Sequence, residues 1–138
     1  MDLSSLDTVS ASAEGASLEL RNPVSDAVLR DEKSGEPVTI TLVGTDSRDY
    51  MKITHDIQNR RLGKRLGKGG RLKTTAEEID ADALELLVAS TKSWQHIIVD
   101  GAELSFSAAN ARMLYTRFPW IKEQVDEFIA DRSNFLGE

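Results

Sequence analysis

Apolar residues follow two different periods along this chain. Near its start they alternate with polar residues, most clearly over residues 38–43, where Ile40 and Leu42 stand beside threonines. A period of two predicts a β-strand with one apolar face and one hydroxylated face. Shorter stretches at residues 17–20 and 27–30, separated by turn sequences, predict two further strands. We therefore expect a small antiparallel meander with one solvated face.

From residue 46 onward, apolar residues recur every three or four positions, which predicts helices. The first helix begins at residue 46 or 47 and is expected to fray after Arg61, because the glycines that follow disfavour a helix. The second begins at Thr75, which forms a capping-box pattern with Glu78, and ends near residue 92. Residues 94–99 are predicted as one strand or as an extended connector.

Two more helices are predicted near the carboxyl end of the chain. Ser107 is suited to cap the first of them, which ends before Pro119. Pro119 is also suited to the first turn of the next helix. The predicted fold class is α+β, a small N-terminal antiparallel β-meander followed by about four α-helices.

A single α+β domain is expected over residues 17–136, preceded by a flexible N-terminal arm. Residues 1–16 are rich in Ser, Asp, Thr and Ala and show no apolar period, as is typical of loosely attached segments. A chain of 138 residues can bury enough surface to fold without disulfides or a structural metal. It has no cysteine, which excludes disulfide frameworks and cysteine-based metal sites.

Charge is distributed unevenly along the chain. The formal net charge is −6, yet the Gly-rich loop at residues 60–73 is strongly basic and contains no acid. Its basic residues are Arg60, Arg61, Lys64, Arg65, Lys68, Arg71 and Lys73. The loop is interpreted as solvated, as docking on an acidic partner or another copy of this chain, or as a nucleic-acid contact. Nucleic acid is disfavoured, because the loop has no aromatic residue for base stacking.

Residues that could support catalysis or bind a cofactor are sparse. The two histidines, His55 and His96, are far apart in sequence and outside metal-ligand spacings. The glycines of residues 63–70 do not follow the spacing of a phosphate-binding loop, and no nucleophile elbow is present. We therefore predict no catalytic residue, cofactor or metal. A signal peptide and a run of ~20 apolar residues are also lacking, so no membrane partner is expected.

Aromatic residues gather late in the chain. Phe118 and Trp120 flank Pro119 at the predicted junction between the last two helices. Aromatic residues at helical spacing usually pack in a core. Two short amphipathic helices can nevertheless leave part of their apolar surface exposed, and such patches are typical of protein contact sites.

Three stretches of sequence carry a family resemblance. The first is residues 38–47, VTITLVGTDS, and the second is Trp94 with residues 100–104, DGAEL. The third comprises residues 106–115, FSAANARMLY, residues 118–125, FPWIKEQV, and residues 132–136, RSNFL. Over about residues 18–136 the chain resembles the small tail assembly chaperones of long-tailed bacteriophages and prophages. The pattern Ser-x-x-Asn-Ala-x-x-Leu-Tyr ahead of a proline is its most specific part.

The resemblance implies a role in phage tail assembly, in the cytoplasm of a bacterial host. Proteins of this family coat the tape-measure protein, a long helical chain, and help to bring tail-tube subunits to it. They are typically absent from the finished virion. Some are made in two lengths by a ribosomal frameshift, an event that a protein sequence does not record.

A chaperone of this kind has to cover the apolar stripes of its partner reversibly. That role calls for amphipathic helices and for many weak contacts along one chain. The two carboxyl-terminal helices are therefore the expected contact surface. Its residues are Leu114, Tyr115, Phe118, Trp120, Ile121, Val125 and Phe128.

Two other functions remain open from the sequence. A structural tail or head–tail connector subunit would persist in purified particles. A nucleic-acid-binding regulator would act through residues 60–73, and its binding would weaken steeply with salt.

Overall fold

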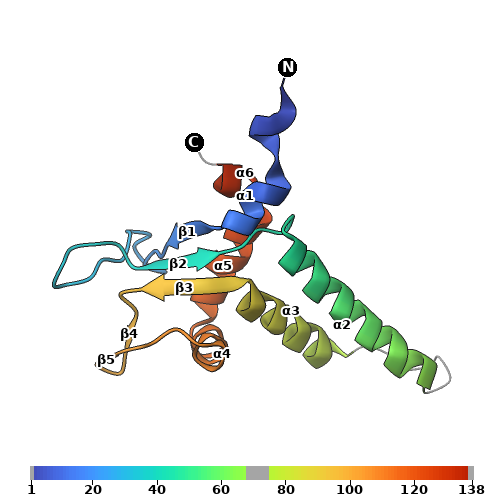
Figure 1. Ribbon diagram of the computed structural model, residues 1–138. Coiled ribbons are helices and arrows are strands. Elements are labelled where there is room, and N and C mark those ends of the chain that lie inside the picture. Colours follow the sequence, from blue (N-terminus) through green and yellow to red (C-terminus); the bar gives the residue numbers. More distant parts are fainter. Residues whose placement is uncertain (1, 68–74, 137–138) are drawn as a thin grey trace.

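Residues 2–67 and 75–136 are described by a computed structural model. The fold is α+β, as predicted, with a three-stranded antiparallel sheet against the carboxyl-terminal helices and a separate two-stranded hairpin (Figure 1). In chain order the elements are η1 (Leu3–Leu6), α1 (Thr8–Glu14), β1 (Ala16–Glu19), β2 (Thr39–Leu42), α2 (Arg48–Gly67), α3 (Ala76–Ser90), β3 (Thr91–Gln95), β4 (Ile98–Val99), β5 (Ala102–Glu103), α4 (Ala108–Arg117), α5 (Pro119–Ala130) and α6 (Ser133–Leu136).

The three-stranded sheet has the order β1–β2–β3, and both strand pairs are antiparallel. Ile40 and Leu42 of β2 are fully buried, whereas Thr39 and Thr41 are only half-buried. The alternation predicted for residues 38–43 is therefore confirmed. One face of β2 enters the core, and the other carries hydroxyl groups.

The meander predicted ahead of the helices is only partly correct. Residues 27–30 form no regular strand and contribute to isolated bridges, which join Arg21 to Val28 and Arg30 to Pro37. The third strand of the sheet is β3, which follows α2 and α3 in sequence and pairs Trp94 with Ile40. β3, and not residues 27–30, pairs with β2 as the third strand. It adds the large Trp94 side chain to the buried face of the sheet.

The four predicted helices correspond to α2, α3, α4 and α5. The Thr75 hydroxyl accepts a hydrogen bond from the Glu78 amide at 3.2 Å, and the Ser107 hydroxyl accepts one from the Asn110 amide at 3.0 Å. Both predicted caps are thus present. Pro119 is the first residue of α5, where its missing N–H breaks no helical hydrogen bond.

α2 is longer than predicted, because it continues to Gly67 instead of fraying after Arg61. It lies antiparallel to α3, and together they extend away from the sheet as a helical hairpin (Figure 1). Arg60 lies 3.3 Å from the Asp82 carboxylate and 2.9 Å from that of Glu85, and Arg61 lies 2.6 Å from Asp82. These ion pairs join α2 to α3 immediately before the glycine-containing end of α2.

Residues 1–16 differ from the predicted flexible arm, because they contain η1 and α1. Ser12 of α1 is buried, and its carbonyl accepts a hydrogen bond from the Gly44 amide at 3.0 Å. A Cβ atom on residue 44 would lie 2.5 Å from the Ser12 Oγ, so this close approach requires glycine. α1 also packs against α6, while η1 projects beyond the body of the protein (Figure 1).

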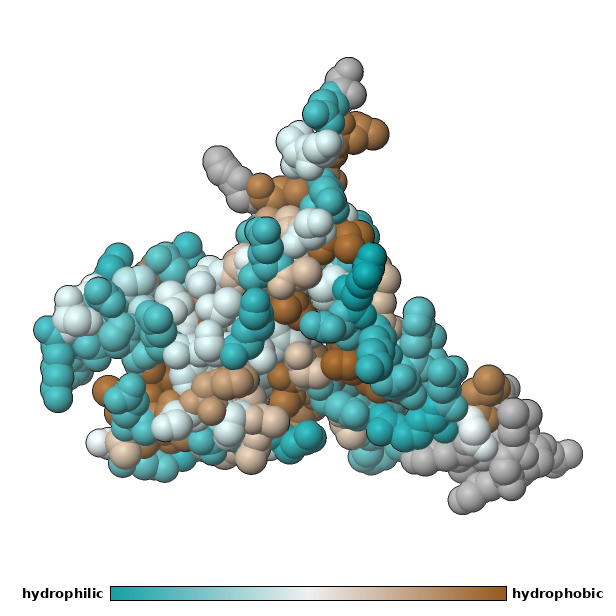
Figure 2. Space-filling model, in the orientation of Figure 1, coloured by the Kyte–Doolittle hydropathy of each residue, from teal (hydrophilic) through white to brown (hydrophobic). Residues whose placement is uncertain are grey.

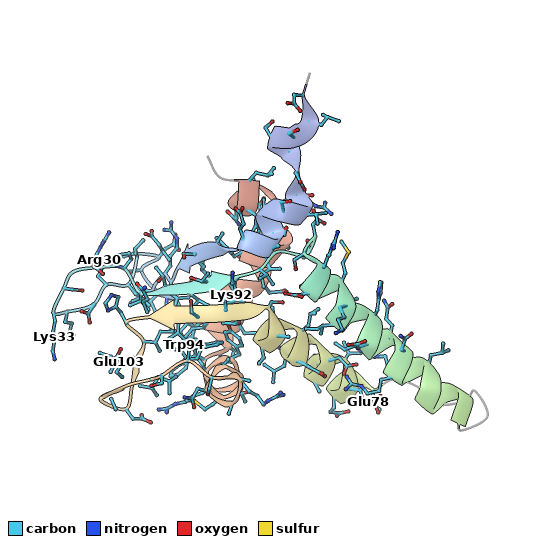
Figure 3. The ribbon with its side chains drawn as sticks, viewed as in Figure 1. Arg30, Lys33, Glu78, Lys92, Trp94 and Glu103 are labelled. Carbon is cyan, nitrogen blue, oxygen red and sulfur yellow. The ribbon has the colours of Figure 1, made fainter. Side chains whose placement is uncertain are left out.

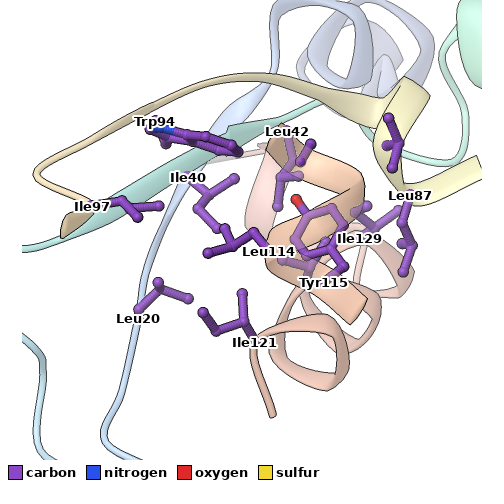
Figure 4. Packing of buried hydrophobic residues seen from close by; sticks show 13 residues of the cluster. Leu20, Ile40, Leu42, Leu87, Trp94, Ile97, Leu114, Tyr115, Ile121 and Ile129 are labelled. Atoms are coloured by element: carbon purple, nitrogen blue, oxygen red, sulfur yellow. The ribbon is translucent and has the colours of Figure 1, made fainter. Parts of the chain in front are cut away.

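The core lies between the apolar face of the sheet and helices α4 and α5 (Figure 4). Within it the Tyr115 hydroxyl lies 2.7 Å from Thr91 Oγ1, which donates to the Leu87 carbonyl at 2.8 Å. Thr91 has only one hydroxyl hydrogen, so Tyr115 is the donor of their shared bond. Burial raises the pKa of Tyr115 to about 12, which keeps this phenol protonated at neutral pH.

Candidate functional site

A groove opens where the core reaches the surface, between the junction of α4 with α5, the β1–β2 connection (residues 20–38) and the β4–β5 hairpin. Its volume is about 790 Å³. The residues that line the groove are Leu20, Leu29, Arg30, Asp31, Glu32, Lys33, Val38, His96, Ile97, Ile98, Val99, Gly101, Glu103, Leu114, Phe118, Trp120 and Ile121.

Apolar side chains form the floor of the groove. Leu114 and Ile121 are 1% and 4% exposed and separate the groove from the core; Figure 4 shows Ile121 next to Leu20 at this end of the core. Phe118 and Trp120 are half-buried and pack edge to face, with ring centroids 6.3 Å apart. The non-helical backbone of Phe118 separates α4 from α5, and both rings line the same groove.

Charged side chains stand on both rims of the groove. Arg30 and Lys33 extend from the β1–β2 connection on one side, and Glu103 extends from β5 on the other (Figure 3). Figure 2 shows apolar side chains at the β4–β5 end of the molecule, beside the hydrophilic side chains of that connection. The groove therefore combines an apolar floor with rims of mixed charge.

The β1–β2 connection is held in place although it is not a regular strand. Gln124 of α5 accepts a hydrogen bond from the Arg21 amide at 2.9 Å and donates one to the Arg21 carbonyl at 2.8 Å. A neighbouring strand would satisfy the same two backbone groups. Farther along, the Leu29 amide donates to the Leu20 carbonyl, and the Val38 amide donates to the Leu29 carbonyl. This wall of the groove is thus ordered by paired backbone groups.

His96 ties the tip of the connection to the sheet. Its Nε2 lies 3.1 Å from the Glu36 carboxylate, and its Nδ1 lies 3.8 Å from that of Asp31. Hydrogen bonds from Ser34, followed by the nearby His96, hold the pKa of Asp31 below its usual value. The Asp31 carboxylate therefore stays ionised and keeps its interaction with the imidazole.

The β4–β5 hairpin forms the opposite wall. Asp100 and Gly101 both have positive φ, 54° and 81°, as a tight two-residue hairpin turn requires. The Asp100 carboxylate accepts hydrogen bonds from the Arg117 guanidinium at 2.7 and 2.8 Å. Trp94 Nε1 donates to the Leu104 carbonyl at 2.7 Å. The hairpin is thus attached both to α4 and to β3.

The structure brings together four of the seven predicted contact residues, since Leu114, Phe118, Trp120 and Ile121 all line the groove. The other three do not line it. Tyr115 and Val125 are 1% and 0% exposed within the core, and Phe128 packs against Phe135 with ring centroids 5.5 Å apart. The prediction of Tyr115 and Val125 as contact residues is therefore wrong, because both side chains are buried in the core.

The sequence did not predict which segments form the rims of the groove. Residues 29–33 were predicted as a strand end and a turn, and residues 96–103 as a connector and a turn. The local signal for a site was the apolar run Ile97, Ile98 and Val99 immediately before the Asp100-Gly101 turn. Nothing in the sequence placed these two segments beside the α4–α5 junction.

The predicted basic loop is divided by the structure. Arg60 and Arg61 belong to α2 and are engaged in the ion pairs with α3. Lys64 and Arg65 also fall within α2. Lys68, Arg71 and Lys73 lie outside the described residues. Arg60 and Arg61 are thus paired with acids of the same molecule, which weakens the nucleic-acid interpretation.

Within residues 2–67 and 75–136, no three His, Cys, Asp or Glu side chains are grouped so as to hold a metal ion. No helix in this part of the chain is long and apolar enough to cross a membrane. What the groove offers is apolar surface framed by charge, which suits the docking of side chains from another polypeptide. Comparison of the chain with protein-family models, with curated proteins and with solved structures gives no match.

Proposed function

We propose that this chain is a phage tail assembly chaperone that binds the tape-measure protein in the groove. The groove is the single observation that carries the proposal. Its floor is formed by Leu114, Phe118, Trp120 and Ile121. Leu114 belongs to the most specific pattern of the family resemblance, and the other three belong to residues 118–125, which also carry it. The same residues thus support the proposal through their geometry and through their sequence.

A helical segment of a tape-measure protein suits the chemistry of the groove. An amphipathic helix docks by placing one apolar stripe in such a groove. Phe118 and Trp120 are partly exposed aromatic residues of the kind that dominate binding energy at protein interfaces. Arg30, Lys33 and Glu103 on the rims can pair with charged residues that flank the stripe.

Modest affinity for each segment fits a role in assembly. A single groove covers a short stretch of a long helical chain, so many copies are needed along one partner. Linked binding events then supply the overall strength, while each contact stays reversible. Tail-tube subunits can therefore replace the chaperone as the tube grows. The net charge of −6 helps to keep the unbound chaperone dispersed.

Co-purification with the tape-measure protein of the same tail module tests this proposal. Phe118→Asp places a carboxylate on the apolar floor and is expected to reduce the recovered partner about tenfold or more. Because Phe118 is half-buried, circular dichroism melting has to show that the variant folds. Ile98→Asp is a second variant, and Ile98 lines the groove with 57% of its surface exposed.

Val24→Asp is the matched control, since Val24 is 94% exposed and does not line the groove. It is expected to recover as much tape-measure protein as the unmodified chain. Undiminished recovery with folded Phe118→Asp and Ile98→Asp would contradict the proposal. Mass spectrometry of purified particles separates the rival function, because a structural tail or connector subunit remains in the virion.

A further inference from the structure

The N-terminal segment presents apolar side chains that are not covered within the molecule. Leu3 and Leu6 of η1 are 67% and 48% exposed, and Val9 of α1 is 41% exposed. In a 3₁₀-helix, residues three apart lie directly above one another, so Leu3 and Leu6 form one apolar ridge. Figure 2 shows a hydrophobic group on this projecting segment. We call residues 3–9 the apolar arm.

The apolar arm cannot fold back into the groove of its own chain. α1 is fixed to the body by the buried Ser12 against Gly44 and by its packing on α6. Figure 1 places η1 far from β4 and β5, on the other side of the sheet. A contact between the arm and a groove therefore has to join two copies of the chain.

The arm and the groove are complementary in hydropathy. The arm exposes Leu3, Leu6 and Val9, and the groove has an apolar floor. Charge does not favour the contact, since Arg30 and Lys33 stand together with Asp31 and Glu32 on one rim and Glu103 stands on the other. Burial of apolar side chains is therefore what drives the contact.

We propose that the apolar arm of one copy docks in the groove of a second copy, with Leu3 and Leu6 on its apolar floor. The contact is heterologous, since two different surfaces meet, and one copy can therefore use both surfaces at once. An arm of this length buries less than the roughly 1,200 Å² of a standard protein interface. The association is consequently weak and depends on concentration. It uses the groove of the proposed function but does not require the tape-measure protein.

Sedimentation of the isolated full chain from about 1 μM to about 1 mM tests the contact. The average mass of the unmodified chain is expected to rise with concentration. Leu6→Asp in the arm and Ile98→Asp in the groove wall are each expected to raise the dissociation constant about tenfold or more. Leu62→Asp, which changes a 53% exposed leucine of α2, is the matched control and is expected to associate normally.

Mixing two variants distinguishes this contact from a symmetric dimer. Leu6→Asp keeps an intact groove, and Ile98→Asp keeps an intact arm. A mixture is therefore expected to form a dimer that grows no further, although each variant alone stays monomeric. A mixture that stays monomeric would overturn the proposal, as would an unmodified chain that stays monomeric throughout. Loss of association in Leu62→Asp alone would place the contact on the helical hairpin instead.

Discussion

At the scale of single residues, Asp46 links two distant parts of the chain. Its carboxylate accepts hydrogen bonds from Arg132 Nε and Nη2 at 2.6 and 2.9 Å. This side chain therefore joins the β2–α2 connection to the residue before α6. Arg132, then Thr8, lowers the pKa of Asp46 from 3.8 to about 2.

Asp46→Asn is expected to destabilise the protein at neutral pH. The substitution removes the charge, and the cost is about 1 kcal/mol, because Arg132 is largely exposed and water screens the pair. A carboxylate whose pKa is lower in the folded state stabilises it above the unfolded pKa. The difference between the two proteins is therefore present above about pH 4 and disappears as the pH falls toward about 2.

Urea unfolding of both proteins at pH 7 and near pH 2 measures this difference. Glu127→Gln is a suitable control, because Glu127 is exposed and makes no ion pair within the described residues. A gap between Asp46→Asn and the unmodified chain that stays constant across this pH range would contradict the account.

At the scale of elements, local signals fixed the helix boundaries that the sequence could predict. Thr75, Ser107 and Pro119 act on their own neighbours in the chain, so their effect is visible without knowledge of the fold. β3 was not predicted as part of the sheet, because its position depends on pairing Trp94 with Ile40 across two helices. The ion pairs that Arg60 and Arg61 make with α3 likewise depend on acids far along the chain.

The helical hairpin of α2 and α3 is expected to be sensitive to salt. Arg60 and Arg61 both contact Asp82, whose side chain is 18% exposed. Asp82→Asn is therefore expected to speed amide hydrogen exchange at residues 58–63 while leaving α4 unchanged, with a loss of up to about 1 kcal/mol. Added salt is expected to speed exchange in the unmodified chain in the same region.

Glu77→Gln on the same helix is the control for this measurement, since Glu77 is exposed and does not contact Arg60 or Arg61. Its exchange at residues 58–63 is expected to match that of the unmodified chain. Equal exchange in Asp82→Asn and Glu77→Gln would show that these ion pairs do not hold the hairpin together.

At the scale of the whole molecule, the groove is assembled from segments that are distant in sequence. The helical stripes of α4 and α5 predicted its floor at Phe118 and Trp120, because an aromatic pair around a helix break is a local feature. The same stripes predicted a contact surface that is larger than the one observed, since Tyr115 and Val125 are buried in the core. Neither wall was predictable, because the Gln124 contact to Arg21 that fixes one of them spans 103 residues.

Ser12 near the start of the chain and Phe135 near its end both lie against Gly44. Gly44 is therefore expected to control how the two ends pack together. A Cβ at residue 44 would lie 2.5 Å from Ser12 Oγ, 2.9 Å from Ser12 Cβ and 3.2 Å from Phe135. Rotation can move the Oγ atom away but not the Cβ atom, so α1 has to shift. Gly44→Ala is therefore expected to lower the free energy of unfolding by about 1–3 kcal/mol, measured by urea denaturation.

Gly63→Ala is the matched control, because a Cβ at Gly63 meets nothing within 4 Å. It is expected to stabilise the chain by about 0.5–1 kcal/mol, since alanine favours α2 more than glycine does. Ser12→Gly removes both atoms that a Cβ at residue 44 would strike. If α1 is docked as described, Gly44→Ala costs less in the Ser12→Gly background than in the unmodified chain. Equal costs in the two backgrounds would mean that residues 8–14 are not packed on Gly44 in solution.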